Sequence, residues 1–102
     1  MEGDTNTWMG RGAVVQDVRV GKLTSGDYAC SFQLAISCRG GRMTWVRVNV
    51  YDKRVVRYVE GHLENGSQVA VVGELMNRKK TGQGGPQLTE VRAFEIRTIR
   101  QE

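Results

Sequence analysis

The sequence predicts an all-β domain, a five-stranded Greek-key barrel with one short helix between the third and fourth strands. Five runs of alternating or β-branched apolar residues are separated by turns that contain glycine. One further segment carries its apolar residues at the three- and four-residue spacing of an amphipathic helix. The 102 residues suit a single domain, and 39% apolar with 25% charged residues is the composition of a globular protein.

The first two strands are expected over residues 8–20 and 28–38. The first mixes apolar and polar residues with Gly10 and Gly12, so we expect a long strand that bends at a glycine. The second alternates clearly between apolar and polar positions, which predicts a half-buried strand. Its core-facing residues are expected to be Cys30, Phe32, Leu34 and Ile36.

The third strand is expected to begin at about Met43, after a tight turn. The turn is Arg39-Gly40-Gly41-Arg42, and a Gly-Gly pair suits a two-residue hairpin because both central positions need a positive φ. Along the strand the even positions are mostly β-branched and apolar, whereas the odd positions are polar or aromatic. We therefore expect an outward row formed by Trp45, Arg47, Asn49 and Tyr51.

The helix is expected to begin after Asp52, which can cap its N-terminus, and to stop at Asn65-Gly66. A fourth strand over residues 67–76 and a fifth over residues 87–99 follow. In the fifth strand the alternation of apolar residues is imperfect, so we expect a β-bulge or a shift of register there. A basic, glycine-rich hairpin loop over residues 78–86 joins the two strands.

Five strands with a lone helix after the third, on a chain of this length, is the element order of the oligonucleotide-binding (OB) fold. We expect residues 7–100 to form this OB-fold domain and residues 1–6 to be a polar N-terminal lead. A partly open barrel of this kind has strand edges that can pair with another chain. We therefore expect a homo-oligomer, either a dimer or a tetramer, or a heteromer with another OB-fold protein.

Four segments carry the motifs of a known family. Trp45-Val46-Arg47-Val48 precedes the helix, and Gly66-Ser67-Gln68-Val69 follows it, with Gly73-Glu74-Leu75 and Arg78-Lys79 further along. Two further segments are Gly12-Ala13-Val14-Val15-Gln16-Asp17 in the first strand and Phe32-Gln33-Leu34-Ala35 in the second. Together they resemble the bacterial and mitochondrial type of single-stranded DNA-binding protein, over most of the chain.

The resemblance implies where nucleic acid binds. Trp45 matches a tryptophan on which bases stack, and Tyr51 matches an aromatic residue, usually Phe, with the same role. Arg47, Arg78 and Lys79 match basic positions of the family.

The chain also departs from the family pattern. The turn over residues 38–42 has no aromatic ring, and Lys80 stands where the family has Trp, so two stacking platforms are missing. Val46 replaces a His that the family uses in its subunit contacts. These departures favour an alternative function, an OB-fold interaction subunit of a larger nucleoprotein complex. Such a complex could be primosome-like or resemble the trypanosomatid RNA-editing complex, with RNA or protein as the main partner.

The charge of the chain favours an anionic partner. Lys and Arg number 15 against 11 Asp and Glu, for a net charge of +4, and Arg predominates. Arg binds phosphate bidentately and stacks on flat rings, which suits nucleic acid. We therefore predict sequence-nonspecific binding of single-stranded nucleic acid, DNA by resemblance with RNA left open, through base stacking and phosphate contacts. The predicted binding residues are Trp45, Arg47, Tyr51, Arg78, Lys79, Lys80, Arg39 and Arg42.

The same composition argues against an enzyme, a metal site or a cofactor. One His and two Cys cannot complete a four-ligand zinc site, and the acidic residues are dispersed. His62 has no Ser, Cys or Asp constellation around it in the sequence. Cys30 and Cys38 would lie ~26 Å apart in one strand, too far for a disulfide, so we expect a reducing compartment.

The sequence also bears on location. No uncharged apolar stretch approaches the roughly 20 residues that a membrane span needs, so we expect no membrane partner. The acidic, polar start fits neither a signal peptide nor an Arg-rich transit peptide. We expect a cytoplasmic protein of the nucleoid, or a mitochondrial protein if a transit peptide was removed.

Overall fold

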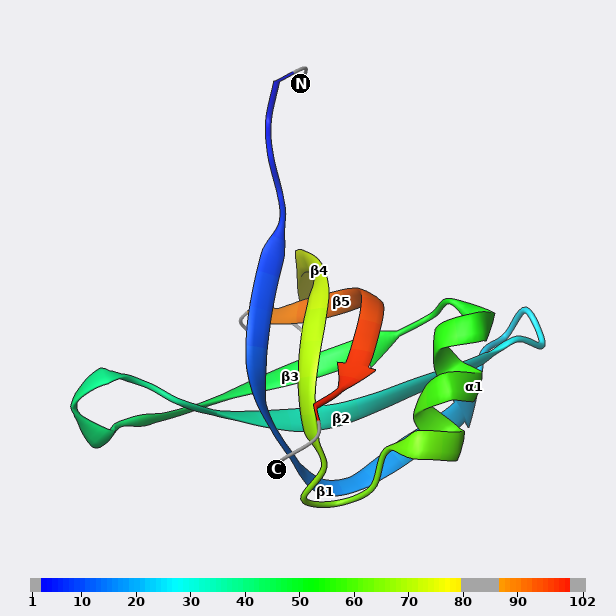
Figure 1. The fold of residues 1–102 in the computed structure, drawn as a ribbon. Coiled ribbons are helices and arrows are strands. Elements are labelled where there is room, and N and C mark those ends of the chain that lie inside the picture. The colour runs from blue at the N-terminus through cyan, green and yellow to red at the C-terminus, as the bar shows by residue number, and fades with distance from the viewer. Residues whose placement is uncertain (1–2, 80–86, 100–102) are drawn as a thin grey trace.

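Five strands and one helix follow one another in the expected order in the computed structural model, which describes residues 3–79 and 87–99 (Figure 1). They are β1 (Trp8–Lys22), β2 (Tyr28–Ser37), β3 (Met43–Val50), α1 (Lys53–His62), β4 (Gln68–Lys79) and β5 (Gln87–Thr98). The strands are hydrogen-bonded in the order β1-β2-β3-β5-β4, and β4 also pairs with β1, which closes the barrel. This confirms the predicted OB-fold barrel, although the barrel is closed where we expected it to be partly open.

The two halves of strand β1 pair with different strands. Residues 8–13 pair with β4 and residues 13–22 pair with β2, so that Ala13 has a partner on each side. The ladder with β2 is interrupted between Val15 and Arg19, where Gln16 has a φ of 67°. The irregularity of the β1–β2 ladder therefore lies at Gln16 and not at a glycine. Gly12 instead allows a close approach, because a Cβ there would collide with the carbonyl oxygen of Ala35.

The β2–β3 hairpin projects from the barrel as a long arm (Figure 1). The backbone N–H of Cys38 donates to the carbonyl oxygen of Arg42 (2.7 Å), so the loop contains three residues, Arg39–Gly41, and not the two that we predicted. Gly40 and Gly41 both have the expected positive φ, 75° and 76°. The additional residue forms part of a short 3-10 turn at the tip of the arm.

Helix α1 covers one end of the barrel. Its N-cap is Asp52, as predicted, whose Oδ1 accepts hydrogen bonds from the backbone N–H groups of Arg54 (2.8 Å) and Val55 (3.4 Å). The helix ends at His62, earlier than the predicted stop, because the chain is already extended at Leu63. Gly66, with a φ of 96°, instead forms the turn that leads into β4. The residues that the helix and its C-cap bury in the core are Val56, Val59 and Leu63.

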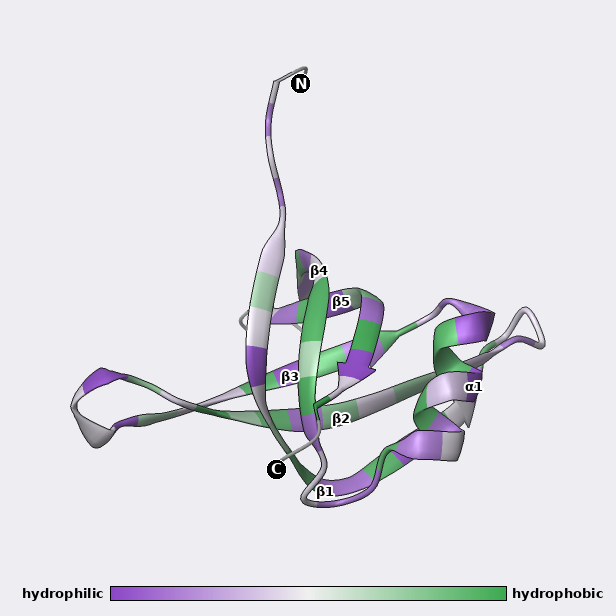
Figure 2. Ribbon diagram, in the orientation of Figure 1, coloured by the Kyte–Doolittle hydropathy of each residue, from purple (hydrophilic) through white to green (hydrophobic). Residues whose placement is uncertain are grey.

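Strand β4 runs to Lys79, three residues beyond the predicted end, and its first half is mostly hydrophobic in Figure 2. Val69 and Val71 are buried in the core, whereas Ala70 and Val72 are only half-buried on the outer face. One face of β4 therefore packs in the core, and the apolar run over residues 69–72 is not buried on both faces of the sheet. At the start of the chain, the Asn6 side chain exchanges two hydrogen bonds with the backbone of Leu75 (both 2.9 Å).

Strand β5 contains the predicted bulge. Gly73 pairs with Ala93 while Val72 pairs with Glu95, so Phe94 is an extra residue in β5. The buried positions change parity across it, from Val91 and Ala93 to Ile96. This single insertion explains the imperfect alternation of the sequence.

Candidate nucleic-acid interface

Strand β3 and Tyr51, the residue directly after it, present the predicted row of side chains on the outside of the barrel, with one exception. Trp45 is 61% exposed, and Arg47 and Tyr51 are half-buried. Asn49 lies in the same row but is only 4% exposed. The prediction of an outward Asn49 was therefore wrong, because a side chain of β5 covers it.

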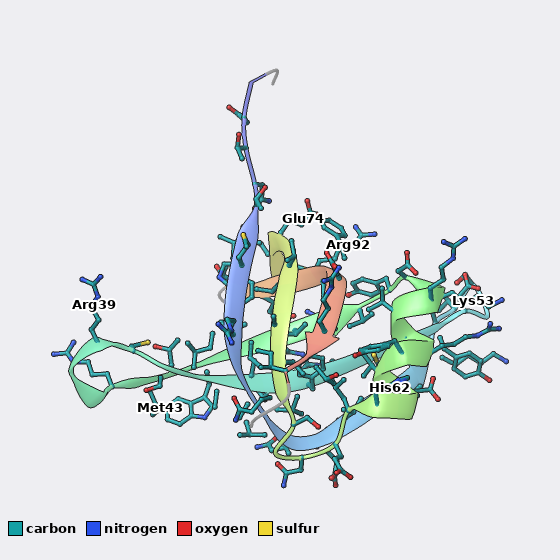
Figure 3. All side chains as sticks on the ribbon, in the orientation of Figure 1. Arg39, Met43, Lys53, His62, Glu74 and Arg92 are labelled. Carbon is teal, nitrogen blue, oxygen red and sulfur yellow. The ribbon has the colours of Figure 1, made fainter. Side chains whose placement is uncertain are left out.

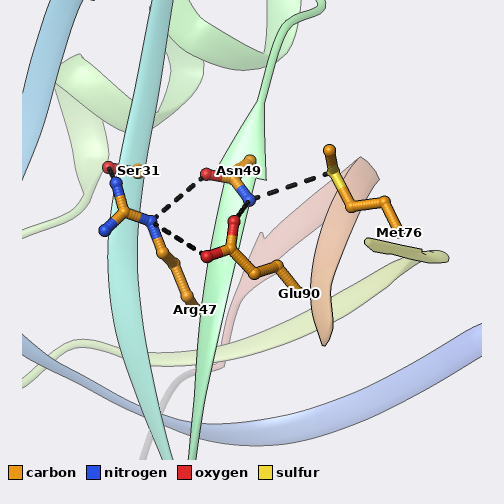
Figure 4. Close-up of polar contacts among 5 residues, drawn as sticks. All are labelled: Ser31, Arg47, Asn49, Met76 and Glu90. Atoms are coloured by element: carbon orange, nitrogen blue, oxygen red, sulfur yellow. Dashed lines mark hydrogen bonds and ion pairs between the residues drawn. The ribbon is translucent and has the colours of Figure 1, made fainter. Parts of the chain in front are cut away.

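That side chain is Glu90, which belongs to a polar cluster on this face (Figure 4). Asn49 Nδ2 donates to Glu90 Oε1 (2.8 Å) and lies 4.0 Å from the sulfur of Met76. Arg47 Nε lies 3.4 Å from Asn49 Oδ1 and 3.8 Å from Glu90 Oε2, and Arg47 Nη2 donates to Ser31 Oγ (3.3 Å). The cluster therefore holds the Arg47 guanidinium against the barrel wall.

The cluster has two consequences for binding. An arginine held by neighbours loses less conformational freedom when it contacts a phosphate. Against this, the buried carboxylate of Glu90 offsets part of the positive charge of Arg47. The sequence did not identify Glu90, because its place beside Arg47 depends on the pairing of β3 with β5.

Tyr51 also has a basic neighbour that the sequence did not identify. The guanidinium carbon of Arg92 lies 5.4 Å from the centre of the Tyr51 ring, which is the geometry of a cation–π contact. Arg92 is exposed on β5 and pairs with Asn49 in the parallel ladder. Figure 3 shows Arg92 beside Glu74, its partner in the β4–β5 ladder. Arg92 therefore adds a cation beside Tyr51.

Arg39 and Arg42 lie on the arm. Both are exposed, and Figure 3 shows Arg39 at the tip, away from the barrel. Five residues of extended chain separate Arg42 from Arg47, or ~17 Å. The structure therefore does not bring these two predicted cations together with Arg47. Arg39 and Arg42 could contact a bound nucleic-acid strand only if that strand continued along the β2–β3 arm.

The remaining predicted cations are Arg78 and Lys79, the last two residues of β4, and Lys80, the next residue in the sequence. The backbones of Arg78 and Lys79 belong to this strand and pair with residues 88 and 87 of β5, but their side chains lie outside the described part of the structure. Lys80 lies outside the described residues altogether. The role of all three remains a prediction.

The described residues offer no sign of other chemistry. Within residues 3–79 and 87–99, no group of three or more His, Cys, Asp or Glu side chains could hold a metal ion. Burial, and to a smaller extent the charge of Glu60, raises the pKa of the Cys30 thiol to about 11, so this residue is an unreactive part of the core. No helix in the described ranges has the length and apolar character to cross a membrane.

Comparison with known proteins identifies the family and the fold of the chain. The Single-strand binding protein family profile matches residues 5–99. A solved structure titled "Plasmodium falciparum SSB complex with ssDNA" is similar over 98% of this chain and 99% of that chain, with a TM-score of 0.85 and 26% identity. No curated protein matches by sequence.

Two crystal structures of the S. cerevisiae mitochondrial single-stranded DNA binding protein Rim1 have the same fold. Their TM-scores are 0.79 and 0.78, each at 12% identity over 97% of this chain, and the alignments cover 98% and 100% of those chains. At that identity the likeness concerns the fold alone. The family match, in contrast, spans nearly the whole sequence, and the chain therefore belongs to the single-strand binding protein family.

Proposed function

We propose that this protein binds single-stranded DNA without sequence preference, as a binding protein and not as an enzyme. The observation that carries the proposal is Trp45, a large aromatic side chain that is 61% exposed on the outer face of β3, two residues from Arg47. Stacking of a base on an aromatic side chain contributes about 1–3 kcal/mol and tolerates any base, because every base has a flat π face.

In this proposal the ring of Trp45 on β3 and the ring of Tyr51, directly after β3, bind different parts of one DNA strand. Six residues separate Trp45 from Tyr51, which places the rings ~20 Å apart along an extended chain. Successive nucleotides lie much closer together than this, so several nucleotides span the interval, and Arg47 lies between the rings to contact their phosphates. The proposed binding residues are Trp45, Arg47, Tyr51, Arg78, Lys79, Lys80, Arg39 and Arg42.

Tryptophan fluorescence tests the proposal. Oligo(dT) added at two salt concentrations should quench the emission, and the affinity should fall as salt rises. The variant Trp45→Phe should lose most of the quenching, whereas Trp8→Phe should keep it, because the Trp8 ring packs over Gly10 beside the core. Absence of quenching and of binding at low salt would overturn the proposal.

The same titration decides between this function and the alternative of an interaction subunit. If Trp45→Ala left DNA binding unchanged but disrupted assembly with a partner, the row on β3 would be a protein interface. If Trp45→Ala weakened DNA binding by about tenfold or more, which corresponds to ~1.4 kcal/mol, the row would be a base-stacking surface.

We further propose that the protein forms a homo-oligomer. Met9 is 74% exposed and pairs with Val72, next to Ala70, so a small apolar surface lies on the outer face of β1 and β4. In the described part of the chain, residues 8–12 have a ladder partner only in β4, which leaves the other edge of this segment available. Light scattering should report a dimer or a tetramer, and Met9→Glu should dissociate it. A wild-type monomer would overturn this proposal and leave a heteromer as the alternative.

The proposed place of action is wherever single-stranded DNA arises, in a bacterial-type nucleoid or in a mitochondrion. Membership of the single-strand binding protein family supports a place where single-stranded DNA occurs, and the similar Rim1 structures are those of mitochondrial proteins. Cell fractionation with an antibody against the chain would decide between the two compartments.

A further inference from the structure

The bulge in β1 borders a small cavity that the proposed function does not use. Its volume is about 170 Å³, and the residues that line it include Gln16 and Arg19 of β1, Ser31 and Gln33 of β2, and Arg47 of β3. Ligand sites for whole small molecules usually measure about 300–1,000 Å³. This cavity therefore suits a single chemical group and not a complete small ligand.

The cavity continues from the row on β3. Gln33 pairs with Arg47 on one side and with Val15 on the other, and Ser31 pairs with Arg19. The lining residues therefore form a path across β2, from β3 to β1. A DNA strand that stacks on Trp45 and contacts Arg47 can follow this path without leaving the barrel wall.

The polar groups of the cavity suit a phosphate. Two of the lining residues are arginines, whose N–H groups match phosphate oxygens. Ser31 Oγ accepts a hydrogen bond from Arg47 Nη2 (3.3 Å), so its own O–H can donate to a ligand. Asp17 also lines the cavity and offsets one of the two cations. Since Glu90 further offsets Arg47, Arg19 is the cation that contributes most at this site.

The backbone at the cavity is in an uncommon conformation. Gln16 is the one non-glycine residue with a positive φ in the described ranges, at 67°. Such conformations often occur at functional sites, where the surrounding structure holds them in place. Here the backbone N–H of Gln16 donates to Asn65 Oδ1 (3.1 Å), and the flanking Val14 is hydrogen-bonded through its N–H and carbonyl to Ser67 and Gly66. The bulge is therefore held by the turn that follows α1.

We propose that this cavity binds one phosphate of the DNA strand, with Arg19 as its principal ligand, so that the strand crosses from β3 over β2 to β1. The inference rests on the proposed function. It adds Arg19, which the sequence did not single out, to the binding residues. It also assigns a path to the DNA strand across the barrel surface.

The test is a set of salt-dependent oligo(dT) titrations on the complete chain. Arg19→Gln should weaken binding by about three- to tenfold and reduce the slope of log K against log[salt] by about 0.7, the loss of one phosphate contact. Arg19→Lys keeps the charge and should keep the slope. The matched control is Arg54→Gln, which removes the same charge from the exposed first turn of α1 and should leave the slope unchanged.

The outcomes separate the two proposals. If the wild-type protein bound oligo(dT) and Arg19→Gln had the same salt slope as Arg54→Gln, the phosphate site would be overturned. The proposed function would remain intact. Failure of the wild-type protein to bind any oligo(dT) would overturn the proposed function, and the phosphate site with it. Because Arg19 is exposed, urea unfolding of Arg19→Gln should match that of the wild type, which excludes a folding defect as the cause of weaker binding.

Discussion

Asn49 and Glu90 join β3 to β5 through a buried hydrogen bond of 2.8 Å between Asn49 Nδ2 and Glu90 Oε1. The two strands share a short parallel ladder, in which Val48 pairs with Val91 and Asn49 with Arg92. The side-chain bond therefore reinforces the seam that closes the barrel. It also places a carboxylate beside Arg47 on the proposed DNA-binding face.

Asn49→Ala should lower the free energy of unfolding by about 1–3 kcal/mol, because it removes a hydrogen bond from a buried carboxylate. Urea unfolding followed by circular dichroism measures this change. Asn77→Ala is the matched control, since the Asn77 side chain is exposed and its bond to Thr89 is long (3.4 Å). The control should change stability by less than about 0.5 kcal/mol. Equal losses in both variants would contradict the role of Asn49.

The buried thiol of Cys30 should make the folded protein less stable at high pH. Burial raises the pKa of its thiol from 9.0 to about 11, so between these values the folded chain holds a proton that the unfolded chain has released. Stability from this group is complete below pH 9 and falls as the pH rises towards 11, by about 2–3 kcal/mol in total. Because Lys and Tyr also titrate in this range, the comparison is with Cys30→Ala, which should lose correspondingly less between pH 9 and 11. Parallel pH profiles would contradict the prediction.

Two glycines should respond in opposite ways to alanine. At Gly73, opposite the β5 bulge, a Cβ would collide with the carbonyl oxygen of Arg92, so Gly73→Ala should destabilise the barrel by about 1–3 kcal/mol. At Gly61 in α1, a Cβ meets no described atom within 4 Å, and the helix should gain about 0.5–1 kcal/mol from Gly61→Ala. Thermal unfolding of the two variants beside the wild type measures both effects. A stable Gly73→Ala variant would show that the bulge can move.

The β2–β3 arm should contribute to the affinity for long DNA only. Arg39→Gln with Arg42→Gln should weaken binding to a long oligo(dT), with a slope smaller by about 0.7 for each lost phosphate contact. Binding of an oligo(dT) of roughly 8 nucleotides, within the range of one OB fold, should change little. The matched control is Arg54→Gln with Arg57→Gln on α1, which removes the same charge. If both pairs weakened short and long DNA alike, the arm would act through overall charge and not through contact.

The local patterns of the sequence predicted most of the fold. The N-cap at Asp52 and the positive φ values at Gly40 and Gly41 depend on neighbouring residues, and both predictions were confirmed. The bulge in β5 could also be predicted, because a regular strand would place Arg92, Phe94 and Ile96 on one face. The irregularity of β1 at Gln16 could not, since the residue pattern drew attention to Gly10 and Gly12.

The site was less predictable, because it depends on which strands become neighbours. Trp45 and Arg47 stand in one strand, so their common face follows from alternation alone. Glu90 and Arg92 lie beside these residues only because β3 pairs with β5, some 40 residues further along the chain. Arg19 lies near them only because of the register between β1 and β2. The burial of Asn49 has the same origin. A pattern within one segment carries no information on such contacts.

The position of Ala13, with partners in both β2 and β4, has a consequence for how the chain folds. The hairpins β1–β2, β2–β3 and β4–β5 connect segments that are adjacent along the chain and can assemble independently. The pairing of residues 8–13 with β4 closes a loop of more than fifty residues, which is entropically costlier and slower. Amide protons of residues 8–12 should therefore acquire exchange protection late in refolding, after those of the second half of the same strand.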